Sequence, residues 1–260
     1  MTTLRLGALG LQRLKHYAES SFEDWVNWEI EQFLSLLPEP DIGLRLLDLG
    51  CGDTQFTQRV ASELQIPPEN VVGVDAFDSE EHEIRVVAGN LNDKLPFDDS
   101  SFDVVISHFS LEHLYNPALF LKEIFRVLTA DGCAVVGTDN LAAWPNILSL
   151  VFGWQPFSST HSIGESRCGN PLALRSSDWF CSEEITSGDT SDADAWRSTG
   201  EFSHNKVLAY RGMMDAYEEA GFVVEAVRGA GYFPFKGSVA KFAAKADRWH
   251  AHFVVTRIRK

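Results

Sequence analysis

Basic residues are scarce in this sequence, which has 22 Lys and Arg against 37 Asp and Glu and a formal net charge of −15 at pH 7. No basic cluster stands out along the chain. A nucleic acid would be repelled by such a protein, because the counterion release that drives nucleic-acid binding needs many Lys and Arg contacts. We therefore expect no nucleic-acid partner.

Long apolar runs are absent too. No stretch approaches the roughly 18 apolar residues of a membrane-spanning helix. The first ten residues, MTTLRLGALG, lack the apolar core and the cleavage site of a signal peptide. The 260 residues are 45% hydrophobic and 23% charged, which suits one large α/β domain with additions. We expect a cytoplasmic protein without a membrane partner.

Cysteine is also sparse, and the four residues Cys51, Cys133, Cys168 and Cys181 form no recognisable disulfide framework. This pattern fits a reducing compartment. Cys168 and Cys181, with His161 nearby, offer zinc-binding side chains, but their spacing matches no compact pair of zinc ligands. We expect no metal site.

The stretch 44–57, LRLLDLGCGDTQFT, organises what the chain does contain. A mostly apolar segment typical of a buried strand runs into Gly50-Cys51-Gly52 and then into a helical pattern. Glycines let the backbone bend sharply and let a ligand lie against it. The following helix offers free N–H groups and the positive end of its dipole. This arrangement predicts a nucleotide pocket in an open α/β sheet.

The glycine loop lacks the third glycine of a dinucleotide fingerprint and the lysine of a phosphate-binding loop. Asp53, at the start of the helix, would repel a pyrophosphate and favours a cationic ligand. A nicotinamide dehydrogenase is therefore disfavoured. Asp75 follows the predicted strand 71–74, at the distance from Gly50 where a carboxylate accepts hydrogen bonds from ribose hydroxyls.

Predicted strands and helices alternate along the chain, which favours a parallel sheet with its ligand at the carboxyl ends of the strands. We expect strands over 44–49, 71–74, 84–88, 102–106, 133–138, 222–227 and 251–258, and helices over 11–37, 54–64, 117–128, 206–220 and 239–246. We divide the chain into an N-terminal helical cap (1–40), a cofactor-binding core (41–139), an insert or substrate lid (140–203) and the remainder of the core sheet (204–260).

Five segments in order carry a family resemblance: LLDLGCGDTQFT, VVGVDAFD, AGNLNDKLPF, FDVVISHFSLEHL and FLKEIFRVLTADGCAVVGT. Together they resemble the class I S-adenosylmethionine-dependent methyltransferases, most closely the branch with an LEH segment after the fourth strand. The resemblance is close over 44–139 and loose over 204–258. It implies a Rossmann-like, doubly wound, seven-stranded and mostly parallel sheet with an antiparallel last strand. S-adenosylmethionine would be the cofactor and S-adenosylhomocysteine the product.

The resemblance also implies which residues contact the cofactor. The first motif would line the methionine moiety, the residues after the second and third strands would hold ribose and adenine, and those ending the fourth strand would face the transferred methyl. In order, these residues are Asp48, Gly50, Cys51, Gly52, Asp75, Ala76, Asn90, Leu91, Ser107 and His108. Asn90 departs from the usual Asp, although its amide oxygen can still accept from the adenine amine.

Histidines are the candidates for a general base, because methylation of a hydroxyl needs a nearby proton acceptor with a pKa close to neutral. We expect His113 or His108 to be that base, and His161 and His204 to contact the acceptor. A magnesium-dependent variant would use Asp139 and Asn140, but the third position, an acid in such enzymes, is Ser107. Hard cations prefer charged oxygen ligands, so magnesium is disfavoured.

The acceptor is expected to be a small polar molecule. Aromatic residues in the insert suit an apolar face or a sugar ring, and O-methylation of a sugar or natural-product intermediate is the favoured reaction. The alternative is a protein that binds the cofactor without turnover. Either could be a monomer or a homodimer.

Overall fold

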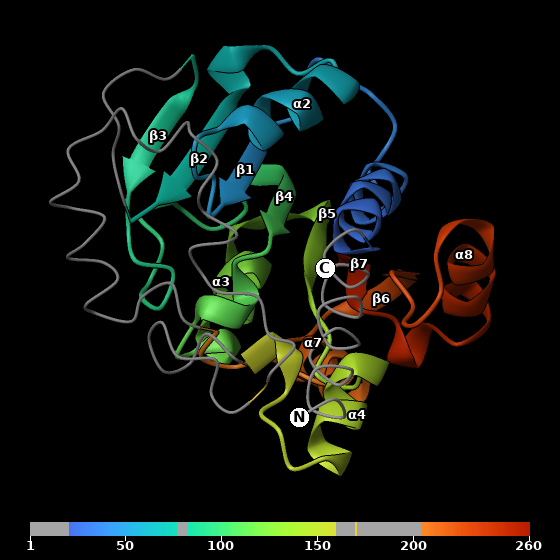
Figure 1. Cartoon of the computed structure of the whole chain (residues 1–260). Helices are drawn as coiled ribbons and strands as arrows, with labels where there is room; N and C mark the ends of the chain where they lie inside the picture. Colours follow the sequence, from blue (N-terminus) through green and yellow to red (C-terminus); the bar gives the residue numbers. More distant parts are fainter. Residues whose placement is uncertain (1–20, 77–82, 160–169, 171–203) are drawn as a thin grey trace, which may run out of the picture.

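One mixed sheet dominates the computed structural model, which describes residues 21–76, 83–159, 170 and 204–260 (Figure 1). Its strand order is β3-β2-β1-β4-β5-β7-β6. The strands are β1 (Leu46–Leu49), β2 (Val71–Asp75), β3 (Arg85–Ala88), β4 (Phe102–His108), β5 (Leu128–Asp139), β6 (Val223–Ala230) and β7 (Phe253–Arg259).

The direction of the strands confirms the expected topology. The five strands from β3 to β5 are parallel, whereas β7 pairs antiparallel with both β5 and β6. The chain winds from β1 outward to β3 and then returns to the other side of β1 with β4. A ligand crevice is expected outside the carboxyl ends of β1 and β4, where this winding direction reverses.

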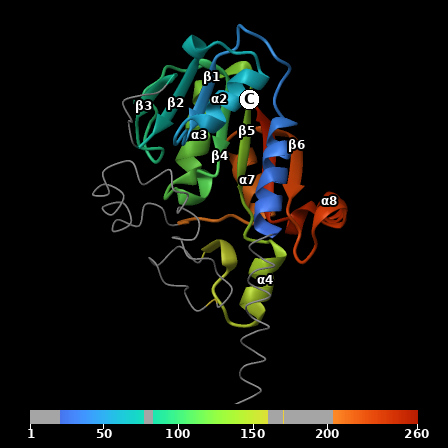
Figure 2. The ribbon, with the colours of Figure 1, turned by 45° about the horizontal axis from the view of Figure 1, so that its top comes forward.

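Helices cover both faces of the sheet (Figure 2). The helix over residues 21–34 and α2 (Gln55–Glu63) lie on one face, where Phe33 and Val60 pack against the sheet in a common core. On the opposite face, α3 (Pro117–Val127) and α7 (Tyr210–Glu219) pack a second core that includes Ile124 and Tyr217. The sheet is therefore the middle of three layers.

Two further helices lie near the carboxyl ends of the later strands. Helix α4 (Trp144–Val151) follows β5, and α8 (Gly237–Ala246) follows the loop after β6. Short 3₁₀ turns also occur, among them η1 (Pro68–Asn70), η2 (Leu111–His113) and η5 (Arg248–His250). Within the described ranges, no helix is long and apolar enough to cross a membrane.

Some boundaries differ from the sequence-based expectation. Strand β5 begins at Leu128, where the sequence predicted the end of a helix, because Leu128 pairs with Phe102 before the register shifts. Helix α7 begins at Tyr210 and not at Lys206. The backbone N–H groups of Asn205 and Lys206 donate to the carbonyl of Glu112 and hold this segment extended.

Candidate active site

The glycine loop after β1 leaves open space at one of its two glycines. Gly50 and Gly52 both have positive φ angles, +88° and +50°. A β-carbon at Gly50 would overlap the Ser110 hydroxyl, whereas one at Gly52 would meet nothing within 4 Å. Gly50 thus packs against the turn after β4, and Gly52 faces space in which a ligand can approach the backbone.

Asp75 lies beside this loop, as the sequence predicted. The Asp75 Oδ2 atom accepts a hydrogen bond from the Gly52 N–H at 2.9 Å. The next residue, Ala76, is exposed. The carboxylate at the end of β2 and the open glycine therefore lie next to each other.

Asp48, in β1, is a carboxylate buried beneath the loop, with 2% of its surface exposed. Its Oδ2 accepts a hydrogen bond from the Thr57 hydroxyl at 2.6 Å, and its Oδ1 has no hydrogen-bond partner among the described residues. Burial raises the pKa of Asp48 to about 6, although the Thr57 bond and the nearby His108 oppose the shift. A positively charged ligand would relieve this cost.

Two of the other predicted cofactor contacts also lie beside the loop. The buried Leu91 side chain reaches within 3.8 Å of the position that a Gly50 β-carbon would occupy. The Cys51 side chain packs against Gly73, and burial raises the pKa of its thiol to about 12. Cys51 is therefore a neutral thiol, and only its backbone is suited to contact a ligand.

Asn90 is engaged in local hydrogen bonds. Its Oδ1 accepts from the backbone N–H of Asn92 at 2.9 Å and from the Asn92 side chain at 3.1 Å. Asn92 in turn accepts from the N–H groups of Tyr115 and Asn116. The loop after β3 is thereby tied to the segment after β4, and the contact between Asn90 and adenine stays a prediction.

His108, at the end of β4, is held by a carboxylate that sequence reasoning missed. Its Nε2 lies 2.7 Å from the Oε2 of Glu29, which is fully buried in the helix over residues 21–34. The His108 ring stacks on Phe56 with centroids 4.1 Å apart. The sequence does contain a pattern that could have pointed to Glu29. Trp25, Glu29 and Phe33 are spaced by four residues, which places Glu29 on the apolar face of that helix.

The turn after β4 contains a strained residue. Phe109 has a φ of +54°, a conformation that bulky side chains rarely adopt, and its N–H donates to the Gly137 carbonyl. Ser107, directly before His108, is fully buried, and its hydroxyl has no partner among the described residues. Strain and unpaired polar atoms of this kind concentrate at functional sites.

A second group of titratable residues surrounds the ends of β4 and β5. The rings of His113 and His204 are in edge-to-face contact with centroids 4.9 Å apart. The His204 Nδ1 lies 3.3 Å from Asp139 Oδ2. Burial alone would lower the pKa of His204, but the bond to Asp139 and the charges of Asp139 and Glu112 raise it. His113 and His204, two candidate site residues from distant segments, thus lie side by side. His161 lies outside the described residues.

Asn140 does not form a magnesium site with Asp139. Its Oδ1 already accepts from the N–H groups of Ala142 and Tyr210, and its Nδ2 donates to the carbonyls of Trp249 and Ala251. The side chain therefore bonds to three backbone segments, and its oxygen already accepts two hydrogen bonds.

An apolar pocket of about 330 Å³ lies between α4 and the loop after β6. It is lined by Trp144, Leu148, Tyr232, Phe233, Pro234 and Phe235. The Trp144 indole donates to the Tyr232 hydroxyl at 2.7 Å, which donates to Asp247 at 2.6 Å. These bonds fix two aromatic walls of a pocket on the same edge of the sheet as the glycine loop.

Comparison with known families agrees with this geometry. A family model described as a methyltransferase domain matches residues 47–136, the segment from β1 to β5. Residues 47–136 thus form a methyltransferase domain of the class I S-adenosylmethionine-dependent type.

Curated relatives match about half of this chain. A demethylmenaquinone methyltransferase of Listeria monocytogenes is 26% identical over 147 residues, which are 51% of this chain and 60% of the relative. A ubiquinone biosynthesis O-methyltransferase of Maricaulis maris is 29% identical over 133 residues, 45% of this chain and 51% of the relative. The chain thus spans less than two thirds of either relative.

A solved structure extends the likeness of the fold to most of the chain. An S-adenosylmethionine-dependent methyltransferase from Mesorhizobium loti superposes with a TM-score of 0.54 at 18% identity, and the match covers 88% of this chain and 96% of that one. The likeness of the fold therefore extends beyond residues 47–136, which the family model matches.

Proposed function

We propose that this chain transfers a methyl group from S-adenosylmethionine to a hydroxyl oxygen of a small molecule. The observation that carries the proposal is the hydrogen bond from the N–H of the open Gly52 to the Asp75 carboxylate, next to the buried Asp48, at the switch point of the sheet. Asp75 can accept from both ribose hydroxyls. In the structure Asp75 accepts a hydrogen bond from the Gly52 N–H, which belongs to the loop that would line the ligand.

Asp48 suits the cationic end of the cofactor. Its Oδ1 is buried and unpartnered, and burial disfavours its charge. The ammonium and sulfonium groups of S-adenosylmethionine are positive, so their approach would stabilise the Asp48 carboxylate. Gly50 and Cys51 would contribute backbone contacts to the methionine moiety, with Ala76, Asn90 and Leu91 near the adenine.

Methyl transfer from a sulfonium is an in-line displacement: the acceptor oxygen forms a bond to the methyl carbon as the carbon–sulfur bond breaks. Correct alignment of the two partners supplies much of the catalysis. The hydroxyl must also lose its proton. We assign this step to His108, because Glu29 at its Nε2 leaves Nδ1 to accept the proton. His113 is the alternative.

The acceptor is proposed to carry an apolar ring or tail. The aromatic pocket next to α4 would hold that part, and its lining favours a natural-product intermediate over a free sugar. The names of the relatives from Listeria and Maricaulis, which act in menaquinone and ubiquinone formation, agree with a ring bearing an apolar tail. His204 and His161 would contact the polar end.

Calorimetric titration with S-adenosylmethionine tests the assignment of the cofactor site. Asp75→Ala should weaken binding at least tenfold, because hydrogen bonds to a carboxylate contribute about 1.5–3 kcal/mol each. Asp215→Ala, an exposed substitution on α7, is the matched control and should leave binding unchanged. Equal affinity in wild type and Asp75→Ala, or no binding by either, would reject the site.

A binding protein without turnover is the second candidate, because the His108 ring is largely enclosed by Glu29 and three phenylalanines, Phe33, Phe56 and Phe109. Incubation with methyl-labelled S-adenosylmethionine and a metabolite extract separates the two. A labelled product excludes the silent protein. Intact cofactor binding with no product in extracts of quinone, phenol and sugar intermediates would favour it.

A further inference from the structure

Three metal-ligating side chains converge next to the acceptor side of the site. Glu112, His113 and His204 each offer one ligand atom, and these atoms all lie within 4.8 Å of one another. The first two belong to η2, directly after β4, and the third precedes α7. Ninety residues of sequence separate the two segments, so no spacing motif announces the group.

Backbone hydrogen bonds hold the two segments together. The N–H of Asn205 donates to the Glu112 carbonyl at 2.7 Å, and that of Lys206 donates to the same oxygen at 3.1 Å. The Asn205 side chain donates to the His113 carbonyl at 2.7 Å. His204 is therefore placed against η2 without any ligand, which lowers the ordering cost of binding one.

The hydrogen bonds made by these side chains resemble those that metal-ligating residues make to their neighbours. The Thr138 hydroxyl donates to Glu112 Oε2 at 2.8 Å. His204 Nδ1 lies 2.7 Å from the Ser158 carbonyl and 3.3 Å from Asp139 Oδ2, so Nε2 is the ring nitrogen that would ligate a metal. Ligating histidines commonly donate their second N–H to a carboxylate or a backbone carbonyl, which fixes the ring and its tautomer.

The charge balance also favours a cation. Glu112 and Asp139 are both buried, with 1% and 7% of their surfaces exposed. A divalent ion bound between these two buried acidic side chains would offset the cost of their burial.

We propose that Glu112, His113 and His204 bind one divalent transition-metal ion of the Zn²⁺ type. Two imidazoles and one carboxylate suit zinc and its neighbours, whereas Mg²⁺ and Ca²⁺ prefer all-oxygen sites. Ligand atoms about 2.1 Å from a tetrahedral zinc lie about 3.4 Å apart, so the ligand atoms need to approach one another by at most about 1.4 Å. This group differs from the cysteine and Asp139–Asn140 sites that the sequence argued against.

Three protein ligands leave a coordination position open. That position lies near the ends of β4 and β5, where an acceptor hydroxyl could bind the ion; this role rests on the proposed function, whereas metal binding itself does not.

Titration with Co²⁺ tests the site, because four- or five-coordinate Co²⁺ absorbs visible light. The full chain, treated with a chelator and desalted, should bind one equivalent of Co²⁺ and release it to Zn²⁺. His113→Ala and His204→Ala should each weaken binding at least tenfold. His250→Ala is the matched control, since His250 pairs with Asp247 away from the group and should bind Co²⁺ as wild type does.

Calorimetry with S-adenosylhomocysteine on the same variants separates this inference from the proposed function. Unchanged S-adenosylhomocysteine binding with lost Co²⁺ binding supports the metal site and a folded protein. If a histidine variant does not fold, Glu112→Gln replaces it, because glutamine keeps the side-chain volume and can still accept from Thr138. The absence of a Co²⁺ spectrum at millimolar metal, or equal binding by wild type and all variants, would overturn the proposal.

Discussion

Asp48 is a buried residue whose surroundings oppose its negative charge. Burial raises its pKa from 3.8 to about 6 in the folded chain. Between these two values the folded state holds a proton that the unfolded state releases. The free energy of unfolding therefore falls as the pH rises from about 4 to about 6, and the full cost remains above pH 6.

Replacing this carboxylate should stabilise the protein and harm the cofactor site. Asp48→Asn should raise the free energy of unfolding at pH 7.5 by up to about 3 kcal/mol, since one pKa unit corresponds to about 1.4 kcal/mol. The gain should vanish at pH 4. Urea unfolding at both pH values measures it, with the exposed Asp215→Asn as control. A gain that is equal at both pH values would contradict the assigned cause.

Glu29 is a positioning residue for His108, and its role predicts a separation of binding from turnover. His108→Ala should lower kcat about 10²-fold or more, the usual contribution of a general base. Glu29→Gln should lower kcat less and shift the pH profile, with the affinity for S-adenosylmethionine within about twofold of wild type. Glu31→Gln, on the same helix but exposed, is the control. An unchanged pH profile in Glu29→Gln would assign Glu29 a purely structural role.

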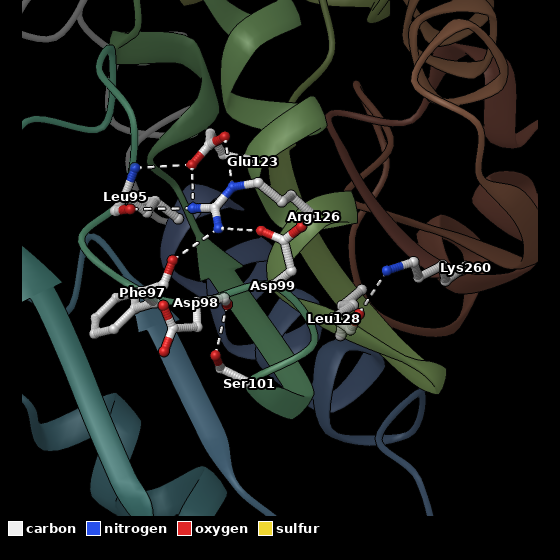
Figure 3. A network of polar contacts seen from close by, with 9 residues as sticks. All are labelled: Leu95, Phe97, Asp98, Asp99, Ser101, Glu123, Arg126, Leu128 and Lys260. Atoms are coloured by element: carbon white, nitrogen blue, oxygen red, sulfur yellow. Dashed lines mark hydrogen bonds and ion pairs between the residues drawn. The ribbon is translucent and has the colours of Figure 1, made fainter.

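At the scale of elements, one arginine joins α3 to the loop before β4 (Figure 3). The Arg126 guanidinium donates to the carbonyls of Leu95 and Phe97 and pairs with Glu123 and Asp99. Glu123 is largely buried and also accepts from the Leu95 N–H at 2.8 Å. This network fixes the loop that leads into the central strand of the sheet.

Removal of the guanidinium would leave the Glu123 carboxylate buried without its partner. Arg126→Met should therefore lower the free energy of unfolding by about 2–4 kcal/mol, measured by urea titration. Arg45→Met, which breaks the half-exposed pair with Asp103, should cost less than about 1 kcal/mol. Equal losses in the two variants would show that the network contributes no more than a surface ion pair.

At the scale of the whole molecule, the cofactor should stabilise the fold because its site joins three strands of the sheet. S-adenosylhomocysteine at one hundred times its Kd should add about 2.7 kcal/mol to the free energy of unfolding. The Tm should then rise by about 5–10 °C. NAD⁺ at the same concentration should leave the Tm unchanged, and Asp75→Ala should lose most of the shift. A Tm shift with NAD⁺ alone would favour a dehydrogenase.

The sequence by itself determined the sheet, its winding and the cofactor loop. These features are local: apolar runs of strand length, a glycine turn followed by a helix, and Asp75 at a fixed distance along the chain. Parallel strands with right-handed crossovers then leave few arrangements, so Gly52 and Asp75 were both predicted to contact one cofactor, and the structure joins them by a hydrogen bond. The antiparallel β7 came from the family resemblance and is confirmed.

Only the tertiary structure decided how the polar groups pair. Glu29 reaches His108 from a helix 79 residues earlier in the chain, and His204 reaches Glu112 and His113 through hydrogen bonds of the next residue, Asn205. No periodicity encodes such contacts, because a buried charge is tolerated only where the completed fold brings its partner. The glycine loop could be predicted because its residues are close together in the sequence. The pairs around His108 and His204 could not, because their residues are far apart in the sequence and meet only in the folded chain.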